Sequence, residues 1–112
     1  MTATTQSTNQ ATIAKTILQQ MGGASRLQAM VNAKNFISAE TDGNCSLTFY
    51  HMKGQNKSNC TRITLMPNDT YTVEFLWVRS PNCTVRSTHE NVYGDTLISF
   101  WESETELCLT FR

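Results

Sequence analysis

Residues 60–79 read CTRITLMPNDTYTVEFLWVR and form the clearest structural pattern in the chain. On both sides of Pro67-Asn68-Asp69, apolar and polar residues alternate with the period of a half-buried strand. Proline, asparagine and aspartate all favour tight turns. The stretch therefore predicts two antiparallel strands joined by a short turn.

A three-residue turn also sets which residues of this hairpin face each other. If Met66 faces Thr70, Arg62 lies opposite Glu74 on one face, where opposite charges form a favourable cross-strand pair. The same register collects the remaining pairs on the second, largely apolar face: Thr61–Phe75, Ile63–Val73 and Leu65–Tyr71. A single register therefore satisfies both faces of the hairpin.

The same alternation occurs in other parts of the chain. A second turn at 80–82 is expected to return the chain into a strand and to set Val85 opposite Trp77. Three segments outside the first hairpin are expected to be strands: 45–52, 83–88 and, as a closing edge strand, 107–111.

Helical spacing is present toward both ends of the chain. The first helix has one apolar stripe, formed by Ile13, Ala14, Ile17, Leu18 and Met21. Gly22-Gly23 is expected to end it, because glycine readily adopts the left-handed conformation of a helix stop. A second short helix is expected over 24–32. The third follows the sheet and has its own apolar stripe, formed by Tyr93, Leu97, Phe100 and Trp101.

Together these elements predict one α+β domain over residues 9–112, preceded by a flexible polar tail over residues 1–8. The sheet is expected to be an antiparallel four- to five-stranded meander, with N-terminal and C-terminal helices packed on one face. The other face is expected to remain largely open to water. A length of 112 residues suits a single domain.

Composition argues against several classes of protein. Nine basic and nine acidic residues give a formal net charge of zero, whereas dedicated nucleic-acid binders are usually basic. No apolar run approaches the roughly 18 residues that a membrane span needs. Residues 1–10 have neither the basic nor the apolar region of a signal peptide, so we expect a cytoplasmic protein.

The cysteines do not have the spacing of a metal site. They are separated by 15, 23 and 25 residues, whereas zinc ligands usually occur as close pairs; the cysteines are Cys45, Cys60, Cys83 and Cys108. We expect reduced structural thiols, no metal and no other cofactor. Without secretion, no glycan is expected at the five N-x-S/T motifs, which begin at Asn44, Asn56, Asn59, Asn68 and Asn82.

Catalytic motifs are weak in this sequence. His51 and His89 are its two histidines, and both fall near the ends of expected strands. Ser87 or Cys83 can pair with His89, but no nucleophile elbow or oxyanion-type glycine motif accompanies them. We therefore expect surface histidines, no catalytic residues and no enzyme.

Leu76 and Val78 are the most suggestive residues for binding. They point away from Phe75 and Trp77, to the face that should be wet, and Tyr50 is expected on the same face. Apolar residues on such a face often mark a surface that contacts a partner protein. The alternative is that residues 24–36 or the N-terminal tail cover this face.

A second alternative is nucleic-acid binding on the same sheet face. Basic residues cluster in the sheet region, at Lys53, Lys57, Arg62, Arg79 and Arg86, and of these Lys53, Lys57, Arg62 and Arg86 are the candidate contacts. Several RNA-binding sheets place such residues beside an aromatic side chain. Pairing of Arg62 with Glu74 weighs against this interpretation, and so does the neutral net charge.

The sequence also resembles a widespread group of small uncharacterised phage proteins. The matching stretches are AKNF (33–36), LTF (47–49), RITL (62–65), DTYTVEF (69–75), VYGDTL (92–97) and the segment 100–107. Two positions differ, because similar proteins carry glycine where this chain has Asn32 and Glu106. Glycine there implies backbone turns. The resemblance implies a phage or prophage origin and no assigned activity.

From these observations we expect a small non-catalytic phage accessory protein that binds a host or phage protein. Inhibition of a host defence system or takeover of host machinery would suit such a protein. The alternatives are a nucleic-acid binder and a component of the virion or its assembly. The sequence does not determine the oligomeric state.

Overall fold

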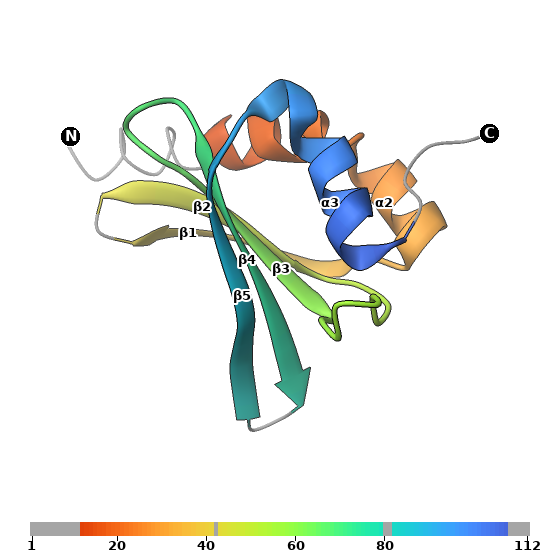
Figure 1. Cartoon of the computed structure of the whole chain (residues 1–112). Helices are drawn as coiled ribbons and strands as arrows, with labels where there is room; N and C mark the ends of the chain where they lie inside the picture. Colours follow the sequence, from red (N-terminus) through yellow and green to blue (C-terminus); the bar gives the residue numbers. More distant parts are fainter. Residues whose placement is uncertain (1–11, 42, 80–81, 108–112) are drawn as a thin grey trace.

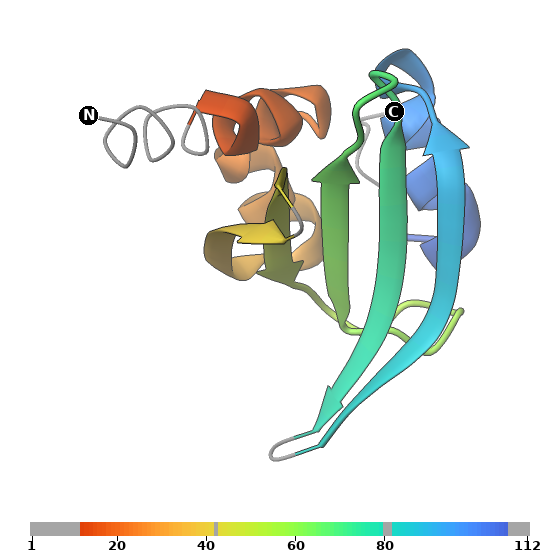
Figure 2. The same cartoon turned by 90° about the vertical axis from the view of Figure 1, so that its left-hand side faces the viewer.

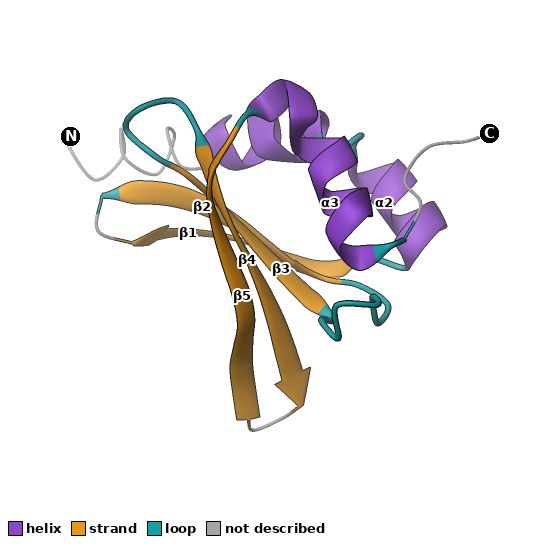
Figure 3. Cartoon of the chain, viewed as in Figure 1, coloured by secondary structure: helices purple, strands orange, loops and turns teal. Residues whose placement is uncertain are grey.

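A computed structural model describes residues 12–41, 43–79 and 82–107. Residues 12–20 form a first helix, followed by the two helices and one 3₁₀ turn named below and by five strands (Figures 1 and 3). In chain order these elements are α2 (Ala24–Val31), β1 (Lys34–Thr41), β2 (Asn44–Tyr50), β3 (Cys60–Leu65), β4 (Tyr71–Arg79), β5 (Asn82–Val92), η1 (Gly94–Thr96) and α3 (Leu97–Thr105).

The five strands form one antiparallel sheet in the order β1-β2-β3-β4-β5, so each strand pairs with its neighbour in sequence. The helices lie together on one side of this sheet (Figure 1). The expected α+β fold, with an antiparallel meander and helices on one face, is therefore confirmed. None of the helices in the described part of the chain has the length and apolarity that a bilayer span requires.

The register predicted for the central hairpin is also confirmed. Arg62 pairs with Glu74, Ile63 with Val73 and Thr61 with Phe75. Met66 donates its backbone N–H to the Thr70 carbonyl at 2.9 Å. The agreement follows from the short turn, since a tight connection determines the pairing of the strands on either side of it.

Two features of the sheet differ from the expectation. Strand β1 was not predicted as a strand, because a β-bulge between Lys34 and Ile37, with Asn35 at φ 56°, interrupts its alternation. In the last hairpin the predicted pairing was wrong. Asn82 pairs with Arg79 and belongs to the strand, so Thr84 lies opposite Trp77 and Val85 lies opposite Leu76.

Each helix ends at a residue whose backbone has the left-handed conformation, with positive φ. The N–H of Gly23 bonds the Leu18 carbonyl and the N–H of Gly22 bonds the Gln19 carbonyl, which is the hydrogen-bond pattern of a Schellman stop. Gly22 has φ 104°. The two positions where similar proteins were expected to carry glycine, Asn32 and Glu106, also adopt positive φ, at 58° and 57°. Both are C-terminal caps, of α2 and α3.

The C-terminal helix begins later than predicted. Strand β5 continues to Val92, and α3 starts at Leu97 after the 3₁₀ turn. Tyr93, expected on the apolar stripe, is 61% exposed. The tail expected over residues 1–8 lies outside the described residues, and so do residues 108–111 of the expected closing strand.

The hydrophobic core lies between the helices and one face of the sheet. Trp101 of α3 is fully buried and packs against Phe49 of β2, with ring centroids 6.3 Å apart. The first helix contributes Ile17 and the sheet contributes Phe75. Because the helices cover this face, functional side chains have to be sought on the opposite face, at the sheet edges or in the loops.

Candidate interaction surface

The sheet face opposite the helices, called the open face below, has no helix packed against it in the described part of the chain. Figure 2 views β3, β4 and β5 from this side, with α3 behind them. Strand alternation and pairing bring one row of side chains across this face, Tyr50–Cys60–Leu76–Val85, and a second row, Ile37–Thr48–Arg62–Glu74–Thr88. The three residues predicted to contact a partner, Tyr50, Leu76 and Val78, all lie here.

One end of the open face is apolar and concave. A hollow of about 350 Å³ has an apolar part lined by Ile37, Tyr50, Leu76 and Val78, and it is bordered by the polar residues Ser46, Thr48 and Arg62. Leu76 is only 2% exposed and forms the floor, whereas Ile37 in the lining is 49% exposed. Val85, which pairs with Leu76 on β5, is 50% exposed. Leu76 was expected to be exposed, so the contact role predicted for it passes largely to the residues around it.

The middle of the open face is polar. Arg62 donates a hydrogen bond to Glu74 at 3.3 Å and forms an ion pair with it. Both residues also line a second hollow of about 320 Å³, together with Thr64, Thr72 and Glu90. The open face thus combines an apolar end with a polar remainder that carries the Arg62–Glu74 ion pair and a further acid, Glu90.

The structure does not gather the four residues predicted for nucleic-acid binding into one site. Arg62 is engaged by Glu74. Lys53 leaves the open face, because its ammonium lies 5.7 Å from the ring of Trp77, which alternation places on the opposite side from Leu76. Lys57 is an exposed loop residue, and Arg86 occupies a bulge in β5.

The cysteines in the described residues are free thiols. Cys45 and Cys60 are buried, and Cys83 is exposed on β5. Burial raises the pKa of Cys60 to about 11, which keeps it protonated at neutral pH. Among the described residues, His, Cys, Asp and Glu side chains form no group of three that could hold a metal ion. Cys108 lies outside the described part.

His51 is a core residue, contrary to the expected surface position. It is 6% exposed, and its Nδ1 donates a hydrogen bond to the Met52 carbonyl at 2.7 Å. The neutral ring then accepts at Nε2 from the Thr61 hydroxyl at 2.8 Å, and the Trp101 indole N–H donates to the same hydroxyl oxygen at 3.0 Å. Burial lowers the pKa of His51 to about 4. This network joins β2, β3 and α3.

His89 lies next to Ser87, one of the two residues that the sequence offered as its catalytic partner. Its Nε2 lies 3.2 Å from the Ser87 hydroxyl and 3.3 Å from a Glu104 carboxylate oxygen. A Ser–His–acid relay uses both ring nitrogens, one for the nucleophile and one for the acid. Here both neighbours share one nitrogen, so this arrangement does not form such a relay.

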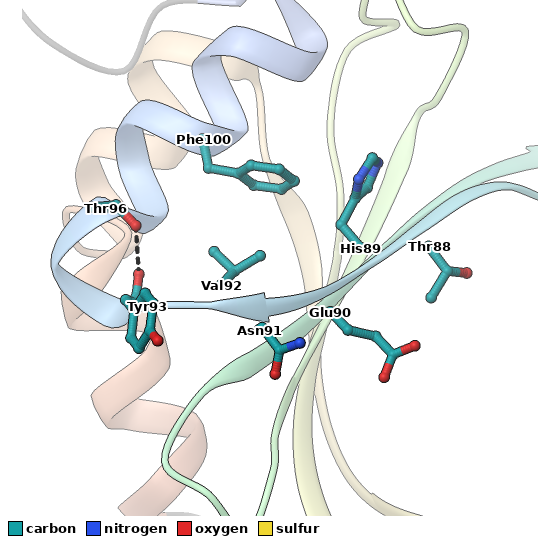
Figure 4. A pocket seen from close by; sticks show the side chains of 8 residues that line it. All are labelled: Thr88, His89, Glu90, Asn91, Val92, Tyr93, Thr96 and Phe100. Carbon is teal, nitrogen blue, oxygen red and sulfur yellow. Dashed lines mark hydrogen bonds between the residues drawn. The ribbon is translucent and has the colours of Figure 1, made fainter.

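A hollow of about 500 Å³ lies next to His89. Consecutive residues of β5 line it, and Phe100 of α3 contributes a further wall. Figure 4 shows His89 and Phe100 on one side of the strand and Glu90 and Asn91 on the other. The hollow therefore follows the outer edge of β5 and does not form an enclosed pocket.

Two of the N-x-S/T motifs are turn structures. The Asn56 side-chain oxygen accepts hydrogen bonds from the N–H and hydroxyl of Ser58, at 3.3 and 2.7 Å. Asn68 does the same with Thr70, at 3.2 and 2.6 Å. Asn59 bonds the backbone N–H and carbonyl of Val78 with its amide. Asn56 and Asn68 therefore stabilise turns, and Asn59 joins the start of β3 to β4.

No protein-family model, curated protein or solved structure matches this chain.

Two structural features that bear on binding were not predicted from the sequence. Ile37 belongs to the strand that was not recognised, and the contact between Lys53 and Trp77 joins a loop to a distant strand. The adjacent apolar residues Phe36 and Ile37 were the sequence signal that could have indicated this strand.

Proposed function

We propose that this chain is a non-catalytic binding protein and that the apolar end of its open face receives a partner protein. The observation that carries the proposal is a sheet face whose apolar residues are left at the surface on both sides of a concave floor. Ile37, in the lining of the hollow on β1, and Val85, the β5 residue that pairs with Leu76, are both half exposed. Apolar groups concentrated in this way commonly mark protein–protein contacts, in which a small apolar centre is surrounded by polar groups.

The chemistry of the other candidate groups supports a binding role. His51 is engaged in hydrogen bonds within the core. In the Ser87–His89–Glu104 cluster the hydroxyl and the carboxylate contact the same ring nitrogen, so a proton cannot be relayed from one to the other through the ring. The resemblance to small phage proteins favours a host or phage protein as the partner, in the cytoplasm of the host cell. Inhibition of a host defence system or takeover of host machinery is the role we favour.

The matched variants Ile37→Glu and Ser38→Glu test this proposal. Both residues are exposed neighbours on β1, but Ile37 pairs with Thr48 on the open face whereas Ser38 pairs with Leu47 on the helix side. We expect a partner captured from host lysate in stoichiometric amount, with and without nuclease, to be lost with Ile37→Glu and retained with Ser38→Glu. Leu76→Glu is less informative, because its floor position makes unfolding a competing explanation.

Three results would contradict the proposal. Equal capture by both variants would remove the open face from the interaction. Capture that depends on nucleic acid would favour the nucleic-acid alternative. Self-association that Ile37→Glu abolishes, measured by light scattering after gel filtration, would make a second copy of the chain the occupant and favour a structural role in a virion or its assembly.

A further inference from the structure

The β4–β5 hairpin continues beyond the rest of the sheet as a two-stranded ribbon. Pairing between β3 and β4 stops at Cys60–Leu76, whereas pairing between β4 and β5 continues to Arg79–Asn82. Figures 1 and 2 both show this hairpin projecting past the other strands. Beyond Leu76 the Asn59 amide still bonds the Val78 backbone, but Trp77 and Val78 are partly exposed and Arg79 is exposed, so both faces of the ribbon reach the surface.

The two faces of the ribbon differ in chemistry. Val78 and Cys83 pair with each other and line the apolar hollow of the open face. Strand alternation places Trp77 and Arg79 on the reverse face. There the Lys53 ammonium lies 5.7 Å from the Trp77 ring. Trp77 is partly exposed and Arg79 is exposed, so this reverse face carries one aromatic ring and two cationic residues.

Charge is unevenly distributed along the chain, although the total is zero. Residues 51–61 and 75–87 contain four basic side chains and no acidic one; these are Lys53, Lys57, Arg79 and Arg86. Residues 88–107 contain five acidic side chains and no basic one. One acid borders the basic region, because Glu106 follows Thr105, whose carbonyl accepts the Gln55 N–H at 2.8 Å.

We infer that the reverse face of the ribbon binds single-stranded nucleic acid, with a base stacked on Trp77 and phosphates paired with Lys53 and Arg79. Single strands are held by exposed aromatic rings that stack on bases and by cations that follow the backbone. The Lys53 contact is near the outer limit of about 6 Å for attraction between a cation and a ring, so a base can displace it. A duplex keeps its bases stacked and leaves Trp77 without a partner.

This inference concerns the opposite side of the ribbon from the proposed protein contact, so the two can fail independently. The probe is a fluorescein-labelled oligodeoxythymidine of about 20 nucleotides, followed by fluorescence anisotropy from about 50 to 300 mM NaCl. We expect affinity to fall as salt rises. Lys53→Gln combined with Arg79→Gln should weaken binding at least about tenfold at the lowest salt and reduce the salt slope by about 1.4, or about 0.7 for each phosphate contact.

Three single variants locate the contact. Trp77→Leu should weaken binding by about tenfold, because one stacked base is lost. Glu106→Gln should strengthen it, because a repulsive carboxylate beside the loop is removed. Lys15→Gln, which removes an exposed cation from the first helix, should leave it unchanged.

Several binding results would contradict a nucleic-acid site on the ribbon. No binding at about 50 mM NaCl, or equal binding by wild type and Lys53→Gln/Arg79→Gln, would overturn the inference. A duplex bound as tightly as the oligonucleotide, with Trp77→Leu without effect, would exclude stacking on this ring. Ile37→Glu should bind the oligonucleotide like the wild type, which separates this site from the open face.

Discussion

The two faces of the sheet are formed by the same strands but differ in how far their side chains are buried. On the covered face, Phe49, Ile63, Val73 and Phe75 are fully buried beneath the helices. On the open face, the same strands present an ion pair, several threonines and an apolar end whose outer residues are half exposed. The comparison shows that the helices bury these residues of the covered face, whereas on the open face neighbouring side chains bury Leu76 and Cys60 but leave Ile37 and Val85 half exposed and available for contact.

The largest test of this comparison is Trp101→Ala against Ile37→Ala. Trp101 is fully buried on the covered side, and its removal leaves a cavity and takes away the hydrogen bond that the Thr61 hydroxyl oxygen accepts from the indole. We expect the free energy of unfolding to fall by about 3–5 kcal/mol for Trp101→Ala and by no more than about 0.5 kcal/mol for Ile37→Ala. Urea denaturation measures both. Similar losses would show that the open face is packed as tightly as the covered one.

The pH dependence of stability provides the next test. Because the folded-state pKa of His51 is about 4, below the usual 6.5, the folded protein holds this ring neutral. Its contribution is fully present above pH 6.5 and is lost as pH falls toward 4, by about 3 kcal/mol in total. We expect His51→Asn to lack this part of the loss when urea denaturation is compared between pH 7 and about pH 4. Parallel curves for wild type and variant would contradict the buried network.

Much of the fold, but less of the site, was predictable from sequence. The central hairpin was correct in register because its turn and both faces are local signals. Strand β1 was missed because the bulge at Asn35 breaks its period, and Val85 was assigned opposite the wrong residue because Asn82 belongs to a strand. Tyr50, Leu76 and Val78 were correctly expected on one face. The floor position of Leu76 and the Lys53–Trp77 contact depend on tertiary packing, which alternation does not report.

The C-terminal end of α3 offers a position at which the stability of the fold can be raised. Glu106 ends α3 with φ 57°, a conformation that disfavours residues with a Cβ atom. We expect Glu106→Gly to raise the free energy of unfolding by about 0.5–1 kcal/mol, since glycine adopts this conformation without strain. Glu106→Ala serves as the control, because it removes the charge and keeps the Cβ. Equal effects of the two variants would assign the gain to charge.

The smallest expected effect is on the open face itself. Arg62 and Glu74 are 41% and 23% exposed in their side chains, so water and salt screen their attraction. A double-mutant cycle with Arg62→Ala and Glu74→Ala should give a coupling energy of about 0.2–1 kcal/mol that decreases in about 1 M NaCl. A coupling above about 2 kcal/mol that does not respond to salt would mean that the pair is shielded from water. In that case the middle of this face is covered in solution, and the distinction between the two faces fails there.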